Sequence, residues 1–220
     1  MENIQNTFDK KKYSIAMILF LVGQIFLVVS TISNGSSIKV LPRWLEAFSG
    51  FVILGIAVII VSLITLLKIK KYFIYSLIAV IFSFLANGFS TICLTSNDPL
   101  YYALSKGFEL SSDILLLIFY VYFFQGNYLI YKDLGYVDES KKMKKYCIIF
   151  LIIHIASIAI QYIAKIPAIS HNLIANRVFL YGSWVVEFAV YVFSLVIVIG
   201  LVINAKKINK EVENNGLQKE

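Results

Sequence analysis

Residues 178–205 have the sequence VFLYGSWVVEFAVYVFSLVIVIGLVINA, a run of 28 residues in which Glu187 is the only charged side chain. A helix rises about 1.5 Å per residue, so about 20 apolar residues cross the roughly 30 Å hydrocarbon core of a bilayer. Transmembrane strands are only about 10 residues long and alternate in polarity. This run therefore predicts a membrane-spanning α-helix.

Five further runs contain no Asp, Glu, Lys or Arg: residues 13–38, 47–67, 72–97, 114–131 and 146–164. The chain of 220 residues is 59% hydrophobic, which leaves too little polar surface for a soluble globule of this size. We expect an all-α, polytopic membrane protein with six transmembrane helices arranged as three hairpins. The transmembrane domain is residues 13–205, between terminal tails at 1–12 and 206–220.

Lys and Arg are distributed unequally between the alternate connecting segments. Fifteen of them fall in the segments on the side of the N-terminus and five on the other side. Short loops rich in Lys and Arg stay in the cytoplasm, so we expect both termini to be cytoplasmic. Cys93 and Cys147 then lie near opposite membrane surfaces and should not pair.

The loops also carry features of their own. The tripeptide Lys-Lys-Tyr occurs at residues 11–13, 70–72 and 144–146. Each copy lies at the start of an odd-numbered span, where snorkelling lysines and interfacial tyrosines are common. Residues 141–145 form a basic cluster that attracts anionic lipid headgroups and also sets topology. In the third loop, Asp98 and Pro99 are suited to cap and begin a short interfacial helix that breaks near Gly107. We expect Glu109 and Asp113 at the outer start of the fourth span.

Polar side chains inside the membrane are expensive and are the natural functional candidates. Counting from the flanking charges places Glu187 somewhat outside the middle of the last span, and Gln24, Asn87 and His154 near the middle of theirs. Helical spacing puts Gln161 on the face of His154, and Tyr191 on the face of Glu187. The candidate ligand- or ion-binding residues are Glu187, His154, Asn87, Gln161, Gln24 and Tyr191.

Two interpretations of these residues stay open. In one, Glu187 binds a cation, exchanges a proton or holds a basic substrate, with His154 as a relay and the amides as hydrogen-bonding partners. In the other, Glu187 is neutral or paired, and the amides only hold helices together.

Several functional classes lack support in the sequence. Motifs for hydrolases, nucleotide-binding loops and zinc sites are missing, so we predict no catalytic residues, no metal and no cofactor. Basic residues flank apolar runs and form no polar face, which argues against nucleic acid as a partner. The sequence favours a non-enzymatic role.

In size, helix number and loop length the chain resembles the membrane-embedded substrate-binding subunits of energy-coupling-factor vitamin transporters. Those subunits carry an Ala-x-x-x-Ala pattern on the first helix. Here Ala16 is followed four residues later by Phe20, so the docking motif of that family is missing.

The leading hypothesis is a multi-pass protein that binds or transports a small solute or ion at an intramembrane polar site. Its partners would be the lipid bilayer and a small ligand. The alternatives are an interaction or regulatory subunit that docks on another membrane protein, and a lipid-handling protein. The abundance of Lys, Ile and Asn is typical of an AT-rich bacterial genome and predicts location in a bacterial plasma membrane.

Overall fold

The computed structural model describes residues 9–37, 48, 50–95, 98–164 and 173–217. These residues form six α-helices: α2 (Lys10–Ser37), α3 (Phe51–Leu67), α4 (Phe73–Leu94), α5 (Pro99–Asp133), α6 (Val137–Ala164) and α8 (Leu173–Leu217). The predicted all-α class and the number of helices are therefore confirmed for the described part of the chain.

The six helices form a closed ring in sequence order. Each helix packs on the next one along the chain, and α2 packs on α8 to close the ring. The contact between α4 and α5 is the most extensive, whereas α3 and α4 contact each other least. Because α6 contacts α5 and α8 to a similar extent, the packing does not single out three hairpins, and that grouping stays a prediction.

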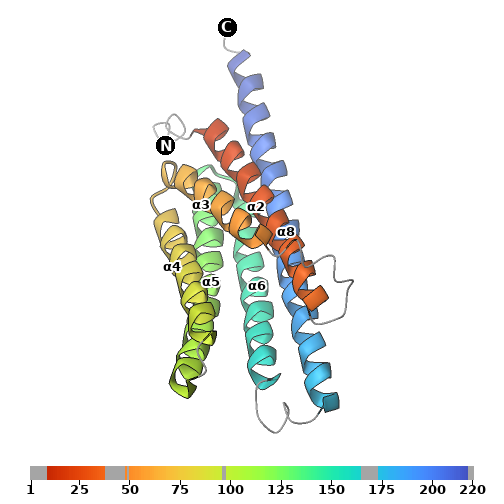
Figure 1. Ribbon diagram of the computed structural model, residues 1–220. Coiled ribbons are helices and arrows are strands. Elements are labelled where there is room, and N and C mark those ends of the chain that lie inside the picture. Colours follow the sequence, from red (N-terminus) through yellow and green to blue (C-terminus); the bar gives the residue numbers. More distant parts are fainter. Residues whose placement is uncertain (1–8, 38–47, 49, 96–97, 165–172, 218–220) are drawn as a thin grey trace.

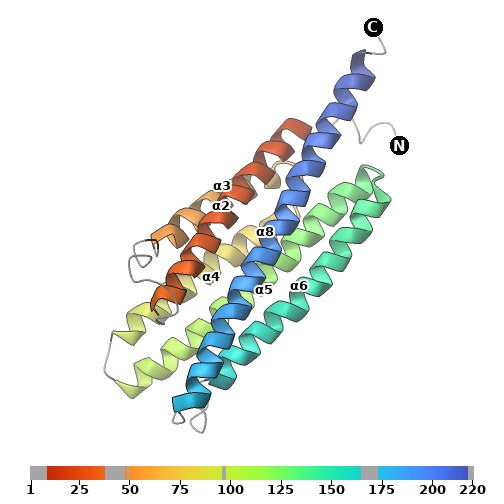
Figure 2. The ribbon, with the colours of Figure 1, turned by 90° about the vertical axis from the view of Figure 1, so that its right-hand side faces the viewer.

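Consecutive helices run in alternate directions, so α2 begins and α8 ends at the same end of the ring (Figures 1 and 2). We call this the Lys10 end and the opposite one the Pro99 end. Helix α3 crosses the ring obliquely, and the last part of α8 extends past the other helices at the Lys10 end (Figure 1). With 45 residues, α8 is roughly 68 Å long.

Five helices, namely α2, α4, α5, α6 and α8, are long and apolar enough to cross a membrane. The sixth, α3, is equally apolar but has 17 residues and a length of about 25 Å. The predicted span at residues 47–67 thus corresponds to a shorter helix that begins at Phe51. Cys93 and Cys147 are both free thiols.

Helix α5 differs most from the sequence-based expectation. Asp98 caps it as predicted, because its side chain accepts a hydrogen bond from the backbone N–H of Leu100 at 2.8 Å, with Pro99 as the first residue. The helix then continues without a break through Gly107 to Asp133. The prediction of a short separate helix that ends near Gly107 is wrong.

Glycines allow two close helix approaches. A Cβ atom on Gly23 of α2 would lie 2.9 Å from the carbonyl oxygen of Gly55 on α3, and the same helices share a hydrogen bond from Ser62 to the carbonyl of Ala16. Gly126 of α5 leaves room for the ring of Phe73, which a Cβ would meet at 2.7 Å. Small residues of this kind let transmembrane helices pack backbone to backbone.

The centre of the ring, toward the Lys10 end, is filled by aromatic side chains. Phe20 of α2 stacks on Phe123 of α5 with ring centroids 3.9 Å apart, and Phe119 lies 6.0 Å from Phe20. Tyr120 and Phe124 continue this packing to Phe150 of α6. Nearer the Lys10 end, the hydroxyl of Tyr13 donates to the side-chain carbonyl of Asn127 at 2.7 Å.

We predict that Gly23→Ala lowers the stability of the protein by about 1–2 kcal/mol, although alanine is normally the better helix former. The added methyl group meets the α3 backbone and forces α2 and α3 apart. The measurement is thermal unfolding in detergent micelles. Gly88→Ala is the control, since a Cβ there meets nothing within 4 Å. Equal unfolding midpoints for both variants would contradict the close approach.

Candidate functional site

A cavity of about 200 Å³ lies inside the ring and is lined by α2, α3, α4, α5 and α8. Most of its wall is apolar, including Leu27, Ile56 and Val80. Six polar side chains also line it: Ser83, Asn87, Ser112, Asp113, Glu187 and Tyr191. Ligand sites in proteins are mostly apolar, with a few polar groups that fix orientation, and this cavity has that composition.

Two carboxyl groups share this cavity, Glu187 from α8 and Asp113 from α5. Because both groups line one cavity of about 200 Å³, their negative charges would repel each other. Such a pair in an apolar setting is costly unless a cation or protons compensate the charge. The sequence analysis identified Glu187 as a candidate but not Asp113.

Asp113 corrects an expectation drawn from the sequence. It was expected at the outer start of the fourth span, but it lies well inside α5, which begins fourteen residues earlier at Pro99. Glu109 does not begin a helix either; it accepts a hydrogen bond from Lys106 at 2.8 Å on the same helix. Because α5 starts at Pro99, Asp113 lies about four turns into the helix, where it lines the same cavity as Glu187 of α8.

A smaller cavity of about 30 Å³ adjoins the first between α5, α6 and α8. Its walls include His154, Ser157 and Gln161 of α6, and it shares Asp113, Glu187 and Tyr191 with the larger cavity. The volume is close to that of one water molecule. Asp113, Glu187 and Tyr191 therefore lie between a cavity with room for a small solute and a cavity with room for one water molecule.

His154 faces the smaller cavity from α6. Its side chain is 8% exposed, and its ring stacks on Phe150 at 5.4 Å between centroids. Neither ring nitrogen has a hydrogen-bond partner among the described residues. Buried polar atoms normally find partners, and a water molecule in this cavity would supply one to the imidazole.

Gln24 does not line either cavity. It is fully buried in α2, and its Oε1 accepts hydrogen bonds from Tyr120 of α5 at 3.1 Å and Ser194 of α8 at 2.7 Å. Ser194 also bonds the backbone carbonyl of Tyr191. Gln24 therefore joins three helices next to the site rather than contributing to its walls.

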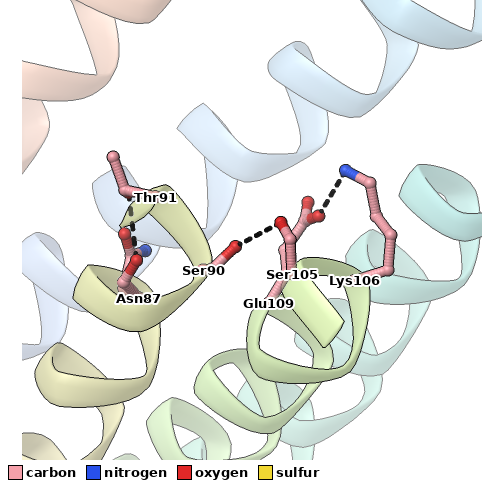
Figure 3. Close-up of polar contacts among 6 residues, drawn as sticks. All are labelled: Asn87, Ser90, Thr91, Ser105, Lys106 and Glu109. Carbon is pink, nitrogen blue, oxygen red and sulfur yellow. Dashed lines mark hydrogen bonds and ion pairs between the residues drawn. The ribbon is translucent and has the colours of Figure 1, made fainter. Parts of the chain in front are cut away.

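Hydrogen-bonded serines hold α4 against α5 beside the larger cavity. Ser83 pairs with Ser112 at 3.0 Å, and nearer the Pro99 end Ser90 pairs with Ser105 at 3.1 Å (Figure 3). Asn87 lies to one side of these contacts, and its backbone carbonyl accepts from Thr91 (Figure 3). The side chain of Asn87 is exposed although it lines the cavity, so the cavity reaches the surface of the ring there.

The structure thus places five of the six sequence-based candidates at two adjoining cavities: Glu187, Tyr191, Asn87, His154 and Gln161. Asp113 and Ser112 also line the larger cavity but were not among the candidates predicted from the sequence. In the part of the chain that the structure describes, no group of three or more His, Cys, Asp and Glu residues is arranged to hold a metal ion.

Comparison of the chain with protein-family models, with curated proteins and with solved structures found no match.

We predict that Gln24→Leu destabilises the protein by about 1–2 kcal/mol, because it leaves the buried hydroxyl of Tyr120 without its acceptor. Gln125→Leu is the control, since Gln125 is exposed on α5 and its replacement should change stability by less than about 0.5 kcal/mol. Chemical unfolding in micelles measures both. If the two variants unfold alike, the contact that joins the three helices does not contribute to stability.

Proposed function

We propose that the protein binds a small organic cation in the cavity between Asp113 and Glu187, as part of a binding or transport function in the bacterial plasma membrane. The observation that carries this proposal is the position of two carboxyl groups in one cavity surrounded by apolar helices. A bound ammonium or guanidinium group would lie between them and offset their mutual repulsion.

The cavity wall favours an organic cation over a bare metal ion. Alkali and alkaline-earth ions prefer a shell of oxygen ligands, whereas most of the wall here is hydrocarbon from residues such as Ile59, Leu116 and Phe119. A volume of about 200 Å³ is below the roughly 300–1,000 Å³ of pockets for drug-sized ligands, so the ligand is small. Asn87, Ser83 and Tyr191 would orient it by hydrogen bonds.

The proposed function includes transport of the bound cation across the membrane. The stacked rings of Phe20, Phe119 and Phe123 fill the ring between the cavity and the Lys10 end. Passage to that side requires these rings to move, as in alternating access around a central site. A cation that binds would displace a proton from the carboxyl pair, and His154, which lines the adjoining cavity, would pass that proton on to water and return it when the cation leaves.

We further propose that both termini are cytoplasmic, so that the cavity lies toward the outer side of the membrane. The support is the distribution of Lys and Arg in the sequence, since 15 of the 20 fall in the terminal tails and connecting segments on the side of the N-terminus. The three-hairpin grouping agrees with the alternate directions of the helices. A regulatory subunit or a lipid-handling protein would have no need for the acidic pair.

We expect Glu187→Gln and Asp113→Asn each to weaken binding of methylammonium or guanidinium at least tenfold, because a charged hydrogen bond is worth about 1.5–3 kcal/mol. Binding of the radiolabelled probes to purified protein measures the effect. Glu109→Gln is the control, since Glu109 pairs with Lys106 and does not line the cavity. If neither probe binds the wild type, or if both cavity variants bind like the control, the cation site is wrong.

The orientation makes a separate prediction. In a variant in which Cys93 and Cys147 are serine, Leu100→Cys should react with a membrane-impermeant maleimide on intact cells. Lys141→Cys should react only after lysis. Both positions are exposed, and Leu100 lies at the start of α5 whereas Lys141 lies in the first turns of α6, at the opposite end of the ring. The reverse pattern would invert the topology and place the cavity toward the cytoplasm.

A further inference from the structure

A third cavity, of about 270 Å³, lies between α6 and α8 near the Lys10 end. It shares no lining residue with either cavity around Glu187. Its polar wall consists of Glu139, Lys142, Tyr146 and Asn204, and most of its apolar wall comes from α8. We call this cavity the α6/α8 groove.

The α6/α8 groove is open to the outside of the ring. Val196 and Ile203 on its α8 wall are 59% and 61% exposed. Between them Gly200 has no side chain, and a Cβ there would meet nothing within 4 Å. In a bilayer these residues face the hydrocarbon, so what fills the groove comes from the membrane.

The polarity of the groove changes along its length. Phe193 and Val196 form one end of the α8 wall, and Asn204 lies eleven residues from Phe193 toward the Lys10 end. That distance is about 16 Å along a helix, close to half of the roughly 30 Å hydrocarbon core. The polar residues of α6 that line the groove lie in its first turns, at the same end as Asn204. The groove is therefore apolar along the depth of one leaflet and polar at its surface.

The charge at the polar rim selects an anion. Lys142 lines the groove, and Lys141, Lys144 and Lys145 are exposed on the same helix. A cluster of lysines at the membrane surface attracts anionic lipids at about 1 kcal/mol per residue. Within the groove wall Lys142 is the one cation and Glu139 the one acid, so the wall matches a headgroup with one negative charge and with hydroxyl groups that donate to the Glu139 carboxylate.

We propose that the α6/α8 groove binds one anionic phospholipid that carries a single phosphodiester charge and a hydroxylated headgroup, as phosphatidylglycerol does. Its phosphate contacts Lys142, its headgroup hydroxyls bond Glu139 and Asn204, and an acyl chain lies against Phe193, Val196 and Ile203. A quaternary ammonium headgroup is disfavoured because it has no hydrogen-bond donor and faces the lysine cluster. This inference does not depend on the cation site.

The test is native mass spectrometry of the full chain in micelles supplemented with phosphatidylglycerol, phosphatidylethanolamine or phosphatidylcholine. Wild type should retain one phosphatidylglycerol molecule in preference to the other two. Lys142→Gln should weaken its retention at least tenfold, because it removes a charged hydrogen bond to the phosphate, whereas Lys141→Gln, outside the groove, should weaken it no more than about fivefold, the effect of one surface charge. Gly200→Leu should abolish retention by filling the apolar part of the groove.

Gly182→Leu is the matched control for Gly200→Leu, because Gly182 is also on α8 and a Cβ there meets nothing within 4 Å. Thermal unfolding of both variants shows whether the fold survives. If Gly200→Leu unfolds early, Ile203→Trp takes its place as a groove-filling variant. The proposal is overturned if a folded groove-filling variant keeps the lipid, if the two lysine variants behave alike, or if phosphatidylcholine or phosphatidylethanolamine is retained equally well.

Discussion

The contact between α2 and α8 closes the ring, and the interior of the protein depends on it. The indole of Trp184 donates to the backbone carbonyl of Thr31 at 2.9 Å, and Ser194 donates to Gln24 at 2.7 Å. Both bonds connect the first described helix with the last. A bilayer offers no partners to polar groups, so this closure is what lets α8 present Glu187 to a protein interior instead of to lipid.

The interior of the closed ring has an aromatic part and a polar part. Toward the Lys10 end, aromatic rings pack closely on one another, as between Phe20 and Phe123. Beyond them the helices leave a cavity with two carboxyl groups, and serine pairs between α4 and α5 keep that wall in place. The aromatic part supplies stability through packing. The polar part costs stability, as polar groups within a membrane generally do, and it is the part that we propose as the binding site.

The sequence predicted the presence of the helices better than their extent. Charge-free runs identify the part of a helix that lies in hydrocarbon, whereas α5 and α8 continue into polar segments that such runs exclude. For the same reason Asp113 was placed at a helix start, since a search for uncharged runs ends at any carboxylate. Counting residues from the flanking charges predicted similar depths for Asn87, His154 and Glu187, and these three residues line adjoining cavities. Such counting does not show which neighbouring helix a side chain faces. Gln24 was predicted at a similar depth, but its side chain bonds Tyr120 and lines neither cavity.

The hydration of the space between Asp113 and Glu187 tests the central claim most directly. The measurement is an experimental structure of the full chain in a lipid bilayer, at a resolution that shows ordered water. The account predicts water or a cation between the two carboxyl groups, continuous with the side chain of Asn87. Side chains that pack the space dry, with both carboxyl groups bonded only to protein, would contradict it.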